Sequence, residues 1–164
     1  MADAAPTGEG AEARARAPLT PETVARIATA ADYNRRIIEE FRANGGKTFG
    51  IFRDQPLLLL TTTGATSGEP RTTPLVYTRD GDRFVIVASN GGAPSHPSWF
   101  LNVLAHPEVS VEVGSERLTM RAAVAEGEAR DHLYARQAAA MPAFTAYQAK
   151  TQRRIPVVVL ERVE

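Results

Sequence analysis

The hydrophobic pattern of this chain changes its period at Pro56, and that change constrains the fold more than any other feature. Downstream of it, short segments of strand-like composition follow one another and end at turn-forming residues. Asp80-Gly81 and Gly114-Ser115 separate two pairs of these segments and are typical of tight hairpin turns. We therefore expect six strands, at residues 57–63, 72–79, 83–89, 109–113, 117–125 and 156–162.

Helical patterns occupy three other stretches, at residues 20–43, 97–105 and 128–140. The first follows a start signal at Thr20-Pro21 and precedes a stop signal at Gly45-Gly46. Its apolar stripe favours docking on the strands, and the alternative is to lie on a membrane surface. Hairpin spacing with such helices predicts an α+β fold, mostly antiparallel β, in which a closed or half-closed barrel carries peripheral helices.

The domain organisation follows from length and local composition. A chain of 164 residues suits one domain. Residues 1–17 are rich in Ala, Glu, Gly and Arg and poor in large hydrophobic side chains, so we expect a disordered lead-in. Residues 18–164 show no internal repeat and no interior linker, and we expect them to form a single domain.

Charge and cysteine content exclude several classes of protein. Lys+Arg and Asp+Glu both number 19, so no overall field attracts nucleic acid. The chain has no cysteine, which excludes disulfides, thiolate metal sites and cysteine nucleophiles. No segment reaches the roughly 18 apolar residues of a membrane span, and the acidic start is unlike a secretory signal. We expect a cytoplasmic protein, with weak contact between the 20–43 helix and the inner membrane face as the alternative.

Two glycine-containing segments are candidates for ligand binding. In residues 61–71, Thr66 and Ser67 precede Arg71, an arrangement that can present hydroxyls, amides and a guanidinium to an anion. The same residues also build an ordinary hairpin loop. Residues 88–100 contain Gly91-Gly92, where a ligand can approach the backbone closely.

Two apolar features carry a structural and a functional interpretation each. Trp99 is the single tryptophan, and it is either a core residue or a wall on which a ring stacks. Met141, Phe144 and Tyr147 share one side of a helical turn and are either core or a cap over a pocket.

Several catalytic templates do not fit. Gly64 and Gly68 enclose a serine one position too late for a nucleophile elbow. His96, His106 and His132 lack metal-ligand spacing, so no metal site is expected. A pocket without an acid–base pair or a metal predicts that a cofactor supplies the chemistry.

The candidate segments occur in a fixed order from about Tyr33 to Arg162. They are Pro56-Leu57-Leu58-Leu59-Leu60-Thr61-Thr62-Thr63-Gly64 with Ser67-Gly68 and Arg71, then Thr73-Pro74-Leu75-Val76, Ala88-Ser89-Asn90-Gly91-Gly92-Ala93, His96-Pro97 with Trp99, Asn102-Val103-Leu104, Tyr147-Gln148 and Arg154-Ile155-Pro156. This series resembles the deazaflavin-dependent nitroreductase family of actinobacteria.

The resemblance implies a split β-barrel, similar to FMN-binding oxidoreductases, that holds the 8-hydroxy-5-deazaflavin coenzyme F420 and passes its hydride to a small organic acceptor. A quinone, a nitroaromatic or an activated enone is the expected acceptor class. By resemblance, the residues that bind the coenzyme are Thr66, Ser67, Arg71, Thr73, Pro74, Leu75, Val76, Ala88, Ser89, Asn90, Gly91, Gly92, Ala93, His96, Pro97 and Trp99.

The resemblance also assigns Ser89 and Tyr147 to orienting the acceptor or donating a proton, and Met141, Phe144 and Tyr147 to the substrate pocket. Family members often carry basic residues where this chain has Ala65-Thr66, which predicts a weaker grip on the coenzyme's phosphate. Nitroimidazole-activating members have tyrosines in place of Met141 and Phe144, which makes that activity doubtful here. The alternatives are a non-catalytic deazaflavin-binding or storage protein, and a split barrel that uses FMN or haem.

Overall fold

The computed structural model describes the backbone of residues 21–48, 50 and 52–163, with side chains from residue 32 onwards in that range. The lead-in expected at residues 1–17 and the start signal at Thr20 lie outside the described residues. The elements run in the order α2 (Pro21–Ala43), β1 (Leu57–Thr63), β2 (Pro70–Val76), β3 (Thr78–Asp80), β4 (Arg83–Val87), η1 (Asn90–Gly92), α3 (Ser98–Ala105), β5 (Glu108–Val113), β6 (Glu116–Val124), α4 (Gly127–Ala140), α5 (Ala143–Lys150) and β7 (Val157–Arg162).

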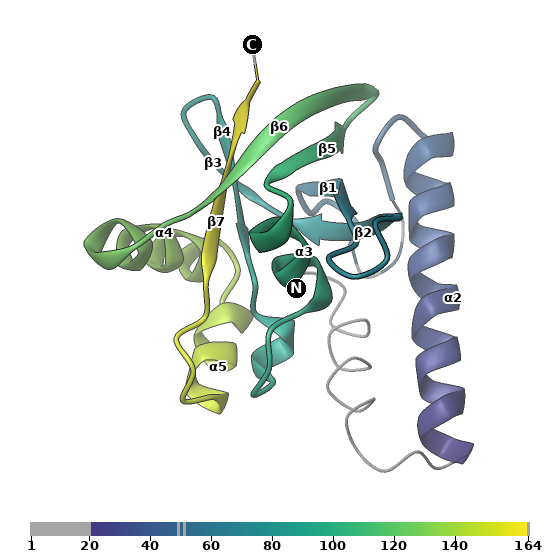
Figure 1. Cartoon of the computed structure of the whole chain (residues 1–164), viewed down its shortest axis with the longest axis horizontal. Coiled ribbons are helices and arrows are strands. Elements are labelled where there is room, and N and C mark those ends of the chain that lie inside the picture. The colour runs from purple at the N-terminus through teal and green to yellow at the C-terminus, as the bar shows by residue number, and fades with distance from the viewer. Residues whose placement is uncertain (1–20, 49, 51, 164) are drawn as a thin grey trace.

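The seven strands form one antiparallel sheet in the order β2-β1-β5-β6-β7-β4-β3. The two edge strands, β2 and β3, follow each other in the chain with Tyr77 alone between them. The sheet must therefore curl until its two edges meet, as Figure 1 shows. This geometry confirms the predicted α+β half-barrel with helices on its periphery.

The edge of the barrel differs from the sequence prediction. Residues 72–79 were expected as one strand in a hairpin with residues 83–89, but β2 pairs with β1, and β3 alone pairs with β4. The chain changes partner at Tyr77, where no glycine or proline marks a break. Pro74 lacks a backbone N–H, and its place in edge strand β2 avoids the loss of a ladder hydrogen bond.

Both predicted hairpin turns are present. Asp80 pairs with Arg83 and Val113 with Glu116, so each loop contains two residues. Gly114 has a φ of 58°, in the region that a tight hairpin turn requires. The predicted turns therefore fix the register of β3 with β4 and of β5 with β6.

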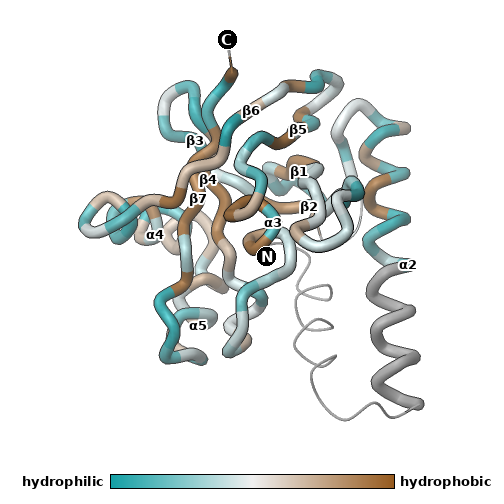
Figure 2. The backbone as a smooth tube through the Cα atoms, viewed as in Figure 1, coloured by the Kyte–Doolittle hydropathy of each residue, from teal (hydrophilic) through white to brown (hydrophobic). Residues whose placement is uncertain are grey.

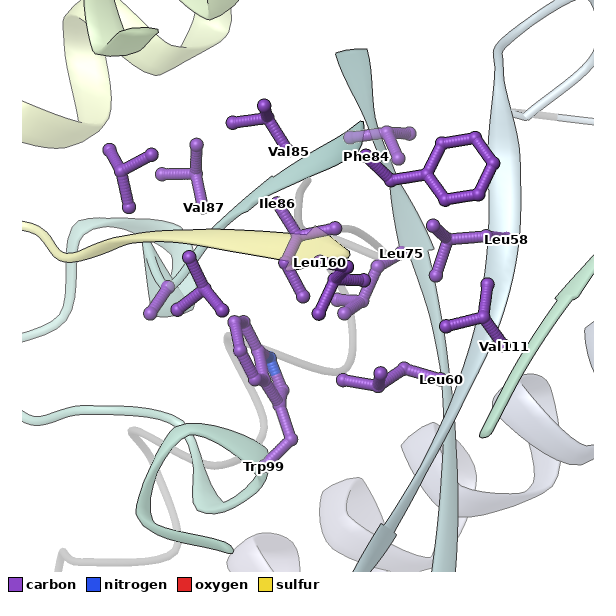
Figure 3. Packing of buried hydrophobic residues seen from close by; sticks show 14 of the residues in the cluster. Leu58, Leu60, Leu75, Phe84, Val85, Ile86, Val87, Trp99, Val111 and Leu160 are labelled. Carbon is purple, nitrogen blue, oxygen red and sulfur yellow. The ribbon is translucent and has the colours of Figure 1, made fainter. Parts of the chain in front are cut away.

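The core lies inside the curled sheet. All side chains of Leu57–Leu60 and Val157–Leu160 are buried, as expected of strands covered on both faces. Figure 2 shows the corresponding apolar colour along β1, β4 and β7. Figure 3 shows Leu60, Ile86 and Leu160 pointing into one cluster.

The C-terminal half of α2 packs on the barrel beside β2 (Figure 1). Ile37 and Phe41 are buried, and the guanidinium of Arg42 donates to the two carboxylate oxygens of Glu112 at 3.0 and 2.8 Å. The hydrogen bond from Arg42, with its positive charge, lowers the pKa of Glu112. Among the described residues, no helix is both long and apolar enough to cross a membrane.

Candidate functional site

A cavity of about 530 Å³ opens between the loop that joins β1 to β2, the start of β2 and the N-terminal turn of α3. We call residues 64–69 the first loop. The cavity is lined by Gly64, Ala65, Thr66, Ser67, Arg71, Thr72, Thr73, Ser98, Trp99, Leu101 and Asn102. Five residues predicted to bind a cofactor therefore surround one space: Thr66, Ser67, Arg71, Thr73 and Trp99.

The first loop is closed by its own backbone and anchored at one side chain. Gly64 N–H donates to the Glu69 carbonyl at 2.8 Å, and Gly68 N–H donates to the Gly64 carbonyl at 2.9 Å. The buried amide of Asn102 accepts from Ala65 N–H at 2.9 Å and donates to the Thr62 hydroxyl at 3.0 Å. Asn102 thus ties the first loop to α3, a role that sequence reasoning missed.

The donors around the cavity suit an anion. Hydroxyls from both loop and strand line it, and the N-terminal turn of α3 adds backbone amides that no helical carbonyl satisfies. Arg71 contributes the guanidinium, with its side chain 56% exposed and its Nη1 atom 3.7 Å from the Glu69 carboxylate. An exposed pair at that distance is weak, so Arg71 is available to a ligand.

The cavity lining also includes the aromatic residue Trp99. Trp99 is 4% exposed, and its Nε1–H is buried without a hydrogen-bond partner in the described part of the chain. Its indole points from α3 towards the cluster around Leu160 (Figure 3). A buried donor that lacks a partner costs free energy unless a ligand satisfies it. The residues present therefore fit a ligand with a phosphate, and the Trp99 Nε1–H is a further buried donor beside the cavity.

The loop after β4 has a different construction. We call residues 88–97 the second loop. Ser89 has right-handed helical φ and ψ, whereas Asn90, Gly91 and Gly92 have φ values of 48°, 64° and 81°. A right-handed residue followed by left-handed ones turns successive backbone N–H groups to one side, which is a known anion-binding arrangement. Asn90 is 1% exposed and its side-chain oxygen has no partner among the described residues.

Two cationic side chains, Arg153 and Lys150, bind backbone carbonyls of the second loop. The guanidinium of Arg153 donates to the carbonyls of Ala88, Ser89 and Ala93 at 3.1, 2.7 and 2.9 Å. Lys150, at the end of α5, donates to a fourth carbonyl of the loop at 3.2 Å. No local motif predicts these contacts, because Arg153 stands about sixty positions from the second loop.

His96 lies against Arg153 and the ring of Phe100. Its Nδ1 atom is 3.1 Å from an Nη1 atom of Arg153, and its ring centroid is 4.8 Å from that of Phe100. Partial burial, with the nearby charge of Arg153, lowers the pKa of His96 below 6.5. The imidazole is therefore neutral at pH 7.

Helix α5 presses directly on the second loop. A Cβ atom on Gly92 would lie 2.7 Å from the backbone oxygen of Tyr147, closer than real Cβ contacts allow. The Tyr147 ring is half-buried and packs edge-on against Phe144 at 5.2 Å. The structure thus brings the predicted acceptor residues Ser89 and Tyr147 to neighbouring segments, with Ser89 itself fully buried.

The remaining predicted residues are dispersed. Leu75, Val76 and Phe144 belong to the core, and Met141 lines a second cavity of about 460 Å³ next to Tyr77. The residues of the second loop do not line the first cavity. Two sets therefore emerge, one around the first cavity and one between the second loop and α5, and they meet where the second loop runs into α3 at Pro97.

Within the described part of the chain, no group of three or more His, Asp or Glu could hold a metal ion. The fold and the cavity define a class of protein: a split β-barrel whose donors suit a phosphate-bearing ring cofactor. A family model described as F420H(2)-dependent quinone reductase matches residues 33–162. The chain belongs to this family, which confirms the deazaflavin-dependent resemblance.

Relatives and solved structures agree with that assignment. An F420H(2)-dependent quinone reductase of Mycobacterium tuberculosis is 44% identical over 110 residues, which is 65% of this chain and 74% of the relative. A second protein of that organism, described as a putative F420H(2)-dependent quinone reductase, is 34% identical over 111 residues. These residues are 68% of this chain and 93% of the relative.

The solved structure of an F420-H2 dependent reductase has a TM-score of 0.60 at 45% identity, over 65% of this chain and 94% of that chain. Another, described as a domain-swapped dimer, has a TM-score of 0.63 at 39% identity, over 87% of this chain and 100% of that chain.

Proposed function

We propose that this protein passes a hydride from reduced coenzyme F420 to a small-molecule acceptor of the quinone type. The observation that carries the proposal is the first cavity, where an anion-binding donor set adjoins a buried indole whose N–H has no partner among the described residues. Membership of the F420H(2)-dependent quinone reductase family names the cofactor and acceptor class that fit it. When bound, reduced F420 supplies the hydride.

The first cavity binds the phosphate side of the coenzyme. Arg71 supplies a guanidinium in the cavity lining, and Thr66 and Ser67 supply hydroxyls. The N-terminal turn of α3 adds a partial positive charge. The buried Nε1–H of Trp99 is a further donor beside this cavity.

The acceptor binds beside the second loop, where the Tyr147 side chain of α5 is partly exposed. Reduction of a quinone to a quinol adds one hydride and one proton. Tyr147 is the side chain best placed to donate that proton from its Oη atom, because it is half-buried beside the second loop. Ser89 is fully buried, so it orients the acceptor indirectly, as part of the second loop. Met141 and Phe144 provide apolar surface around the acceptor.

The proposal is tested by titrating the purified protein with oxidised F420 and following the coenzyme's fluorescence. Saturable binding at micromolar concentrations is expected. An absence of binding, with FMN bound in its place, would overturn the assignment of the cofactor. Binding of F420 without turnover in the presence of a quinone would instead favour a storage protein.

The role of Tyr147 is tested by Tyr147→Phe, which removes the hydroxyl and keeps the ring that packs on Phe144. Turnover is expected to fall by about 100-fold, the low end for loss of a general acid, while the dissociation constant for F420 changes little. Steady-state kinetics and the fluorescence titration measure the two effects. A fall in affinity with unchanged turnover would place Tyr147 in the coenzyme site.

A further inference from the structure

We propose that Arg153 is a positioning residue that shapes the second loop for ligand binding and fixes which ring nitrogen of His96 carries the proton. The proposal rests on the proposed function, because it takes the second loop to be part of the coenzyme and acceptor site. It adds a residue that the resemblance did not assign. Three observations carry it.

The first observation is the number of loop groups that one guanidinium joins. Its Nε donates to the Ala93 carbonyl, its Nη1 to the Ala88 carbonyl and its Nη2 to the Ser89 carbonyl. Its Nη1 also contacts His96 Nδ1 at 3.1 Å. These acceptors span the loop from its first residue almost to α3, so the planar fork of arginine sets their relative positions.

The second observation is that the loop conformation needs such support. Asn90 is a non-glycine residue with a φ of 48°, and two glycines with positive φ follow it. A non-glycine residue in this region is disfavoured and persists only where its surroundings impose the conformation, whereas glycine adopts it readily. Arg153 binds carbonyls on both sides of the left-handed run and thereby opposes its relaxation.

The third observation is that Arg153 is itself held in place. Its backbone carbonyl accepts from Gln148 Nε2 at 2.9 Å. The side-chain oxygen of Gln148 in turn accepts from Ile155 N–H at 3.1 Å and from Arg130 Nη2 at 2.8 Å. Arg130 is buried and also donates to the Ile155 carbonyl. A continuous hydrogen-bond chain thus runs from α4 through α5 to the second loop.

The contact with His96 has a chemical consequence. A guanidinium only donates, so Nδ1 must accept and the proton of the neutral ring must lie on Nε2. The charged group that faces the ring is Arg153, and α3 contributes the uncharged ring of Phe100. Lys150, the other cation on this loop, binds the Gly91 carbonyl. His96 therefore offers its ligand one fixed donor, at Nε2.

The test compares Arg153→Gln and Arg153→Lys with Arg154→Gln. Arg154 is the matched control, because it is the adjacent arginine and its hydrogen bonds go to Asp131 and the Gly127 carbonyl, not to the second loop. Asp131 also accepts from Arg130, so the control shares the α4 end of the hydrogen-bond chain but none of the loop contacts. Two quantities are measured on the full-length protein: the pKa of His96 by NMR, assigned with His96→Asn, and the dissociation constant for F420.

Arg153→Gln is expected to raise the pKa of His96 towards its ordinary value and to weaken F420 binding by about tenfold or more, the scale of a lost charge-assisted hydrogen bond. Arg153→Lys keeps the positive charge but cannot span the acceptors, so the affinity falls while the pKa of His96 stays low. Arg154→Gln changes neither quantity. A purely structural role would not separate the pKa from the affinity in this way.

Wild-type affinity in both Arg153 variants would overturn the proposal. If the wild-type protein binds no F420, the proposed function fails, and the pKa of His96 with hydrogen exchange of the second-loop amides still decides the positioning role. In that case, unchanged pKa and unchanged exchange in Arg153→Gln would refute it. If Arg153→Gln fails to fold, as judged by circular dichroism, Arg153→Lys still tests the positioning role: a wild-type affinity for F420 in that variant would refute it.

Discussion

The first and second loops contain similar residue types but are stabilised in different ways. The first loop is exposed, closes on its own backbone and has one buried anchor, the amide of Asn102. The second loop is largely buried, and cations from the segment around Arg153 hold its carbonyls. Only the first borders the cavity of about 530 Å³.

The difference shows what each loop can contribute. An exposed loop with a weakly paired arginine can exchange solvent for a phosphate at little cost. A buried loop whose carbonyls are already occupied keeps one shape before and after binding, which lowers the entropic cost of recognition. We therefore expect substitutions in the first loop to change affinity, and substitutions in the second loop to change stability as well.

The largest expected effect comes from the same substitution in both loops. Gly92→Ala places a Cβ atom 2.7 Å from the Tyr147 backbone oxygen at a φ of 81°, whereas Gly68→Ala meets no atom within 4 Å at a φ of 72°. The strained backbone costs about 1–2 kcal/mol at either site. The added clash should bring the loss for Gly92→Ala to about 3–4 kcal/mol. Urea unfolding measures both, and equal losses would contradict the contrast between the loops.

Arg71→Ala tests whether the first loop contributes to coenzyme binding. Loss of the guanidinium is expected to weaken F420 binding by about 1.5–3 kcal/mol, the range for a hydrogen bond to a charged group. The free energy of unfolding should hardly change, because the side chain is 56% exposed. Arg121→Ala, at an exposed position on β6, serves as the control. Unchanged affinity in Arg71→Ala would remove Arg71 from the site.

The second loop should also respond to pH. Burial and Arg153 lower the pKa of His96, so the unfolded chain binds a proton more readily than the folded one. The resulting stability is complete above the unfolded pKa, near 6.5, and is lost as the pH falls through the lowered folded value. The difference between the urea midpoints at pH 7.5 and pH 5 should therefore be smaller in His96→Asn than in wild type. An identical pH dependence in the two proteins would exclude His96 as the source.

The smallest expected effect concerns the acidic residue in the first loop. Glu69→Gln removes a carboxylate that lies 3.7 Å from Arg71 and repels an incoming anion. Because both side chains are more than half exposed, the gain in F420 affinity should be only about 0.5 kcal/mol. The gain should disappear at high ionic strength, where exposed charges are screened. A loss of affinity would mean that Glu69 supports the ligand.

Local signals predicted much of the fold. The hairpin turns were foreseen because Gly81 and Gly114 occupy positions that need positive φ. The strand ending at Leu160 was foreseen because an unbroken apolar row is buried on both faces. The change of strand partner at Tyr77 was not predicted, because the chain passes from pairing with β1 to pairing with β4 without a local break in its hydrophobic pattern.

The site was only partly predictable for a related reason. Thr66, Ser67 and Arg71 are near one another in sequence, and the structure gathers them at one cavity. Asn102 and Arg153 act on loops 37 to 65 positions away, so their roles depend on tertiary packing that no local motif encodes. The roles of Ser89, Met141 and Phe144 at the acceptor site stay predictions.

The central claim is that the protein turns over reduced F420 with a quinone. The most direct measurement is to mix the purified protein anaerobically with reduced F420 and menadione and to follow the absorbance of the oxidised coenzyme. We expect steady oxidation that requires protein and quinone together and that slows in Tyr147→Phe. Binding of the coenzyme without any oxidation, or oxidation at the same rate without the protein, would contradict it.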